Sequence, residues 1–251
     1  MNNNYKFNDG DGIFDQPMVV GTVSNCDTLN QPIDLFSSSC DIVELRSDLL
    51  PVDKKSLFEF CNLLEGNGIR TIFTPRLTTE GGCWETDDEE RLVVYKEAMQ
   101  FTSIVDIELS SKHISNLVST VNSNEKSIIL SYHNFERTPC LTDLKKIIRK
   151  MEVYEPTIGK IATRLHSHQD VLTLCDLLRD ESSIRKCVLG MGPLGVKTRV
   201  LYPLLGSCLT YGFLDQSVAP GQIKASKLSG ILKCLMTDTE KPEPISKKIK
   251  K

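Results

Sequence analysis

The segment TIGKIATR, residues 157–164, is a short run of apolar and β-branched residues that contains one lysine, Lys160. Near-continuous apolar runs of this length are typical of strands covered on both faces, as in parallel sheets. A lysine inside such a strand is unusual, because a buried cation without a partner is costly and tends to lose its proton. The segment therefore predicts a buried strand and a special environment for Lys160.

Seven further runs of this kind recur along the chain, at 17–24, 41–46, 69–76, 103–109, 126–133, 186–192 and 207–213. Between the runs lie segments with helical periodicity, at 53–64, 86–101, 141–153, 169–178 and 222–236, with weaker patterns at 111–121 and 198–205. Eight strands that alternate with helices predict an α/β fold, a single-domain (β/α)8 or TIM barrel. Periodicity alone leaves a doubly wound open sheet as the alternative, although no GxGxxG segment follows an early strand.

Composition and charge narrow the class of protein. The chain has 251 residues, of which 25% are charged and 40% hydrophobic, with a net charge of −3. We expect a barrel at 17–240, a flexible lead-in at 1–16 and a basic tail at 241–251. The charge argues against nucleic acid or an anionic membrane as a partner, and neither a membrane-spanning run nor a secretion signal is evident. Nine cysteines without a CxxC pair indicate a reducing, cytoplasmic setting and no metal site.

Polar residues fall repeatedly at the ends of the predicted strands, where a barrel gathers its reactive groups. These residues are Glu44, Arg46, Arg76, Glu80, Glu108, His133, Lys160, Arg199 and Gln222. Each has a simpler explanation: a carboxylate or arginine at a strand end often forms a salt bridge, and a lone histidine often makes a structural hydrogen bond. The histidines of HSH, 166–168, do not share a helix face and do not predict a metal site.

Lys160 is the exception, since its position suggests chemistry. Burial among apolar groups and nearby arginines favours an uncharged amine, and an uncharged amine attacks a ketone to form an imine. The protonated imine acidifies the neighbouring C–H bond, and His133 is suited to remove that proton. Glu80 is a candidate to orient the imidazole, and arginines bind a substrate carboxylate in fork geometry. The set predicts Schiff-base chemistry on a small anionic keto compound.

Seven motifs resemble those of type I 3-dehydroquinate dehydratases of the shikimate pathway. They are ELRSD (44–48), FTPRLTTEGG (73–82), VDIEL (105–109), SYHNFERTP (131–139), GKIATR (159–164), VKTR (196–199) and APGQI (219–223). They occur in the order of the family, and the resemblance covers roughly residues 17–236. A single motif would be weak evidence, whereas seven in order make coincidence improbable.

The resemblance implies a (β/α)8 barrel that dehydrates 3-dehydroquinate to 3-dehydroshikimate without a metal or organic cofactor. Lys160 matches the Schiff-base lysine, His133 the proton-transfer histidine and Glu80 the carboxylate that orients it. Arg199 matches the arginine that binds the substrate carboxylate. The groups that match those holding the substrate hydroxyls and shaping the pocket are Glu44, Arg46, Arg76 and Gln222.

One departure concerns the loop after the last strand, where Val218 stands in place of a substrate-contacting serine of many family members. Either Ser217 substitutes after a local shift or that contact is lost, and Gly221 suggests a loop that closes over substrate. Two rival functions stay open, a class I aldolase acting on another keto acid and a catalytically silent binding domain. We expect a cytoplasmic homodimer, although the residues themselves do not set the oligomeric state.

Overall fold

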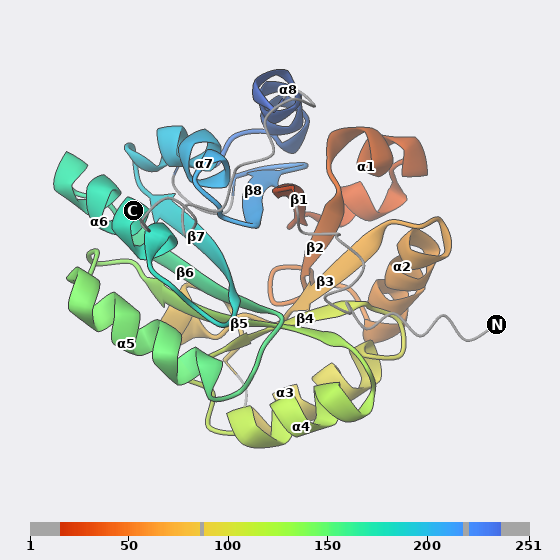
Figure 1. Ribbon diagram of the computed structural model, residues 1–251. Coiled ribbons are helices and arrows are strands. Elements are labelled where there is room, and N and C mark those ends of the chain that lie inside the picture. Colours follow the sequence, from red (N-terminus) through yellow and green to blue (C-terminus); the bar gives the residue numbers. More distant parts are fainter. Residues whose placement is uncertain (1–15, 86–87, 218–220, 237–251) are drawn as a thin grey trace.

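Eight parallel strands form the centre of the chain in the computed structural model, which describes residues 16–85, 88–217 and 221–236. They are β1 (Met18–Val23), β2 (Ile42–Arg46), β3 (Arg70–Thr74), β4 (Ile104–Glu108), β5 (Ser127–Asn134), β6 (Ile158–Arg164), β7 (Arg185–Met191) and β8 (Leu209–Phe213). The first and last residues of each strand lie within two residues of the ends of the corresponding predicted run. Figure 1 shows the strands inside a ring of helices.

The sheet closes on itself. Its order is β7-β6-β5-β4-β3-β2-β1-β8, so that β1 pairs in parallel with both β2 and β8. Between β7 and β8 the backbone N–H of Cys208 donates to the carbonyl of Lys186 at 2.9 Å, and the N–H of Val188 donates to the hydroxyl of Ser207 at 2.9 Å. The predicted (β/α)8 barrel is confirmed, and the alternative prediction of an open doubly wound sheet is wrong.

Seven helices on the outside of the barrel correspond to the seven predicted segments. They are α2 (Lys54–Gly66), α3 (Asp88–Ala98), α4 (Ile114–Ser123), α5 (Leu141–Glu152), α6 (His168–Arg179), α7 (Gly195–Leu204) and α8 (Ala225–Leu235). Local sequence explains where some of these helices begin. Asp53 caps α2 by accepting the N–H of Ser56 at 3.0 Å, and Ser167 with Asp170 forms a capping box at α6.

One helix and two short 3-10 turns were not expected from the sequence. Helix α1 (Ile33–Ser39) has seven residues, three of them serines, and it is held by the burial of Phe36. Serine is a weak helix former and so short a segment shows little periodicity, so tertiary packing decides this element. The 3-10 turns are η2 (Cys26–Asn30) and η3 (Thr78–Glu80).

Two apolar layers position the polar centre of the barrel. One layer lies between the strands and the surrounding helices, and the other lies in the barrel interior, mostly at the start of the strands. The interior layer includes Ile42, Ile104 and Ile158. Because strand side chains alternate, the next inward-facing positions on β4 and β6 are Asp106 and Lys160. Polar groups therefore lie toward the carboxyl ends of the strands, above an apolar base.

Some expectations fall on parts of the chain that are not described. The predicted lead-in at 1–16, except for its last residue, and the basic tail at 241–251 lie outside the described residues, as does Val218. Within the described ranges, no helix is long and apolar enough to cross a membrane.

Candidate active site

All eight side chains predicted for the site line one cavity at the carboxyl ends of the strands. They are Glu44, Arg46, Arg76, Glu80, His133, Lys160, Arg199 and Gln222. The remaining walls are mostly apolar, from Gly81, Phe135, Ala162, Leu189, Met191 and Tyr211. A concave site with a few convergent polar groups among apolar walls is the usual form of a small-molecule site.

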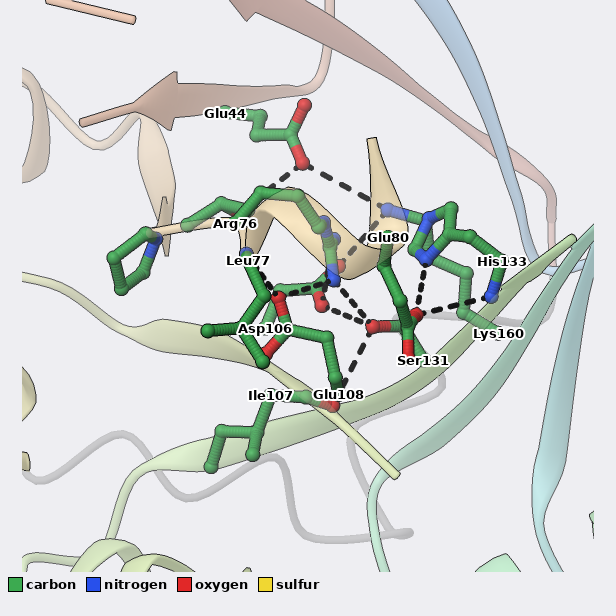
Figure 2. Close-up of polar contacts among 12 residues, drawn as sticks. Glu44, Arg76, Leu77, Glu80, Asp106, Ile107, Glu108, Ser131, His133 and Lys160 are labelled. Atoms are coloured by element: carbon green, nitrogen blue, oxygen red, sulfur yellow. Dashed lines mark hydrogen bonds and ion pairs between the residues drawn. The ribbon is translucent and has the colours of Figure 1, made fainter. Parts of the chain in front are cut away.

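Lys160 lies on β6 at the base of this cavity, with only 4% of the residue exposed. Its Nζ atom donates to Oδ2 of Asp106 at 2.9 Å and lies 3.7 Å from Oε1 of Glu44. The Nζ atom also lies 4.1 Å from the centre of the Tyr211 ring. Figure 2 shows the lysine pointing toward these carboxylates. The amine is therefore partnered in the unliganded protein, and it remains directed at the cavity.

Glu80 and His133 form a second polar pair beside the lysine. Oε2 of Glu80 accepts the backbone N–H of His133 at 3.0 Å and lies 2.9 Å from its Nδ1 atom, while Oε1 accepts the hydroxyl of Ser110 at 2.6 Å. Burial, together with the Arg76 and Lys160 cations, holds the pKa of His133 well below its usual value. His133 is therefore neutral near pH 7, and a proton on Nδ1 leaves Nε2 free as a base.

Burial raises the pKa of the Glu80 carboxyl to about 7, against the opposing effects of the Ser110 hydrogen bond and the Arg76 charge. At neutral pH the Glu80 carboxyl group, which contacts the imidazole, is therefore close to half protonated. The 3-10 turn η3 places it there, and the turn ends at Gly81 with a φ of 78°. A Cβ atom at Gly81 would lie 2.3 Å from the Phe135 ring, and together with the positive φ this contact favours glycine at the position.

Arg46 and Arg76 are held by carboxylates at the cavity wall. Arg76 contacts Oδ1 of Asp106 at 2.9 Å and Oε1 of Glu108 at 3.1 Å, and it donates to the hydroxyl of Ser131 at 2.7 Å. Nε and NH2 of Arg46 donate to the two oxygens of Asp48 at 2.8 and 2.6 Å. These two arginines and Glu108 therefore form ion pairs, as their simpler explanation predicts, and Arg46 and Arg76 also line the cavity.

Arg199 is different, because no ion pair among the described residues includes it. It lies on α7 with 2% of the residue exposed, and its buried Nε atom has no hydrogen-bond partner in this part of the chain. Burial lowers the pKa of Arg199 to about 10, so the guanidinium is still charged at neutral pH. A buried cation without a carboxylate is costly, which suggests that an anion completes the site when a ligand binds.

Sequence reasoning missed two residues that touch the lysine, Asp106 and Tyr211. Asp106 was part of the quoted motif VDIEL, and it is fully buried on β4. A carboxylate in the middle of an apolar strand is as unusual as the lysine in β6, and this signal could have identified it. Tyr211 carries no such signal, since an aromatic residue in a strand is ordinary.

The barrel and its cavity define the chain as a (β/α)8-barrel enzyme that presents a buried lysine, histidine and arginine to one small-molecule site. A sequence model of the family described as type I 3-dehydroquinase matches residues 18–239. The chain belongs to the type I 3-dehydroquinase family. It is a hydro-lyase that dehydrates 3-dehydroquinate to 3-dehydroshikimate in the shikimate pathway, and the type I mechanism uses a Schiff base.

Curated relatives and solved structures agree with this membership. The 3-dehydroquinate dehydratase of Methanococcoides burtonii is 35% identical over 224 residues, which cover 86% of this chain and 95% of the relative. That of Methanococcus maripaludis strain C7 is 37% identical over 215 residues, covering 84% and 94%. The crystal structure of the Geobacillus kaustophilus enzyme has a TM-score of 0.82 at 26% identity, covering 90% and 93%. The Clostridium difficile type I enzyme with covalently modified comenic acid has a TM-score of 0.79 at 25% identity, covering 88% and 92%.

Proposed function

We propose that Lys160 carries the Schiff base of the dehydration and that His133 transfers the protons. One observation carries the proposal. The same cavity holds a buried lysine amine and a neutral histidine, and Nδ1 of that histidine faces the Glu80 carboxylate. The covalently modified comenic acid in the Clostridium difficile relative supports a site that reacts covalently with ligands. Attack requires the lone pair of the amine nitrogen, so the uncharged form of Lys160 is the reactive one.

The reaction then proceeds in balanced steps. The uncharged Lys160 amine attacks the ketone carbon of 3-dehydroquinate. The ketone oxygen takes one proton from the amine and one from solvent and leaves as water, so that a protonated imine with a single N–H remains. His133 removes a proton from the adjacent carbon, and the electron pair moves into the ring to give an enamine. The enamine expels the tertiary hydroxyl at the next carbon, and His133 returns its proton to the leaving oxygen. Water then hydrolyses the imine, which releases 3-dehydroshikimate and the lysine amine.

Glu80 and Arg199 have supporting roles in this proposal. Glu80 accepts Nδ1–H of His133 and keeps Nε2 directed at the substrate carbon. Arg199 binds the substrate carboxylate, which supplies the anion that this buried guanidinium lacks among the described residues. Hydrogen bonds to the substrate hydroxyls come from the other polar groups of the wall, Glu44, Arg46, Arg76 and Gln222.

Reduction of the imine tests the proposal directly. Borohydride added to the protein with 3-dehydroquinate should leave a stable adduct on Lys160, located by mass spectrometry of the digested protein. Lys160→Ala should lose both the adduct and the conjugated product, which is followed by its absorbance. An adduct on another residue, or near-normal turnover by Lys160→Ala, would refute the covalent role.

We propose further that the protein is cytoplasmic and acts as a homodimer. All nine cysteines are free thiols, which supports a reducing compartment. The outer surface of α7 supports an interface, because Leu201, Leu204 and the C-cap residue Leu205 share one side of the helix and are each more than a third exposed. Clustered apolar side chains on a surface are typical of association sites.

Light scattering after gel filtration tests the homodimer. The parent should have twice the chain mass, and Leu201→Glu on α7 should have the mass of one chain. Leu63→Glu is a matched control, since Leu63 is also exposed but lies on α2. A monomeric parent would contradict the dimer, and a dimeric Leu201→Glu would place the interface elsewhere. Cell fractionation tests the location, with the protein expected alongside cytoplasmic markers.

A further inference from the structure

We propose that Asp106 and Tyr211 together stabilise the positive charge of the imine formed on Lys160, with Asp106 as its counterion and the Tyr211 ring as a cation–π surface. The inference rests on the proposed role of Lys160 and adds two residues to the reacting centre. Asp106 is a catalytic residue in this view, because its carboxylate contacts the nitrogen that forms the new bond.

The two oxygens of Asp106 have separate partners. Oδ2 accepts from Nζ of Lys160 at 2.9 Å. Oδ1 contacts NH2 of Arg76 at 2.9 Å and accepts the hydroxyl of Ser131 at 2.6 Å. Arg76 and Ser131 thus fix the carboxylate from one side, and the other oxygen is left for the lysine nitrogen (Figure 2). The carboxylate is oriented before the ligand arrives, so its stabilisation of charge requires no reorganisation.

Asp106 stays ionised in this position. Burial opposes its charge, but the Arg76 and Lys160 cations hold the pKa of Asp106 well below its usual range. It therefore does not serve as the base that takes a proton from the amine. A permanently charged carboxylate beside the nitrogen suits a different task, the stabilisation of a nitrogen that is positive in the imine.

Glu44 is a less suitable counterion than Asp106. Its Oε1 atom lies 3.7 Å from Nζ of Lys160, beyond hydrogen-bond distance, and its oxygens accept the hydroxyls of Thr22 at 3.0 Å and Thr74 at 3.1 Å. A protonated imine nitrogen has a single N–H, since one of the two protons of the uncharged amine leaves with the ketone oxygen when the C=N bond forms. The carboxylate already at 2.9 Å is the acceptor for that one proton.

Tyr211 borders the same nitrogen from β8. Its ring centre lies 4.1 Å from Nζ of Lys160, within the range in which an aromatic face attracts a cation. The Tyr211 hydroxyl is buried and has no hydrogen-bond partner among the described residues. Removal of the hydroxyl therefore breaks no hydrogen bond within the described ranges, so Tyr211→Phe is the matched variant that keeps the ring.

The test compares imine formation with simple binding. The imine is measured by the 3-dehydroshikimate concentration that gives half-maximal borohydride trapping at Lys160. Simple binding is measured with quinate, which has an alcohol in place of the ketone and forms no imine. Asp106→Asn can keep an oxygen toward Arg76 and Ser131 while it presents an NH2 group to Lys160. We expect trapping to weaken about 10- to 100-fold and quinate affinity to stay within about twofold of the parent.

Equal trapping by Asp106→Asn and the parent would overturn the inference. A matched loss of trapping and quinate affinity would also overturn it, because the residue would then act only through pocket structure. Circular dichroism and thermal unfolding show whether the variant folds. If it does not fold, Tyr211→Leu is compared with Tyr211→Phe. Trapping about 3- to 30-fold weaker in the leucine variant than in the phenylalanine variant supports the inference, and equal trapping in the two overturns it.

The same data separate this inference from the proposed function. If the parent forms no adduct at Lys160, the covalent role fails and the inference fails with it. If the parent forms the adduct and neither Asp106→Asn nor Tyr211→Leu weakens it, the role of Lys160 stands and only the counterion assignment is wrong.

Discussion

Nδ1 of His133 lies 2.9 Å from Oε2 of Glu80, and the same oxygen accepts the backbone N–H of His133 at 3.0 Å. One carboxylate oxygen therefore sets both the position of β5 at this residue and the direction of the imidazole ring. The pair is largely buried, and the ring nitrogen that does not face Glu80 is left for the cavity. The proposed division of labour between a lysine that binds covalently and a histidine that moves protons depends on this contact.

His133→Ala should separate these two roles. The variant should still form the Lys160 adduct, because the lysine and its neighbours are unchanged. Turnover should fall by roughly 10² to 10⁴, the usual contribution of a general acid–base group. Product absorbance and mass spectrometry of the reduced adduct measure the two quantities. Loss of the adduct together with turnover would show that His133 is needed for imine formation as well.

Activity should fall as the pH drops through about 7, because Glu80 then gains a proton. Its pKa is raised to about 7, so the carboxylate form that accepts Nδ1–H predominates only above that pH. Protonation of His133 does not contribute to this loss of activity near pH 7, since its own pKa lies well below the usual value. A profile of kcat against pH from 5 to 9 measures the effect.

Glu80→Gln is the matched variant for this profile. Glutamine has the same shape but does not titrate, so the acidic limb near pH 7 should disappear while the rate is lower throughout. A limb near pH 7 that persists in Glu80→Gln would assign the titration to a different group.

Arg199→Met should stabilise the free protein and weaken binding. Arg199 is a buried charge with no ion pair among the described residues, so an apolar side chain of similar length should raise the free energy of unfolding by about 1–4 kcal/mol. Loss of charged hydrogen bonds to the ligand carboxylate should weaken quinate binding by about 10- to 150-fold. Thermal unfolding and calorimetry measure the two effects.

Arg199→Lys serves as the intermediate case, because it keeps the charge and loses the fork geometry. Its affinity for quinate should lie between those of the parent and Arg199→Met. Unchanged affinity in Arg199→Met would mean that the substrate carboxylate binds elsewhere.

Gly82→Ala should destabilise the loop that carries Arg76 and Glu80. A Cβ atom at Gly82 would lie 2.1 Å from the carbonyl oxygen of Arg76, and a backbone atom cannot move aside without shifting the loop. We expect a loss of about 1–3 kcal/mol in unfolding free energy and reduced turnover. Gly66→Ala at the end of α2 is the control, because nothing lies within 4 Å of its added Cβ, and it should be neutral or stabilising by up to about 1 kcal/mol. Equal effects of the two substitutions would contradict the steric explanation.

Most elements of the fold were predictable because their signals are local. The segment 157–164 shows its buried strand in the type and order of neighbouring residues, and β6 spans Ile158–Arg164. The same holds for the other seven strands and for seven helices. Helix α1 lacked such a signal, since its stability comes from Phe36 buried between elements that are distant in sequence.

The eight predicted site residues were identified from motif order and strand ends, and they share one cavity. Their partners were not predictable in the same way. Lys160 lies beside Asp106, 54 residues away in the chain, and beneath the ring of Tyr211, 51 residues away, because strands β4, β6 and β8 converge in a closed barrel.

By itself, the sequence determined the alternation of strands and helices, the placement of polar residues at strand ends and the family. These properties depend on residues close together in the chain, whose hydrophobic pattern decides which side chains are buried. Only the tertiary structure decided that Asp106 and Tyr211 lie beside Lys160 and that Arg199 is buried without a carboxylate among the described residues. Those relationships depend on the register and closure of the barrel, which bring distant residues within hydrogen-bond distance and remove them from water.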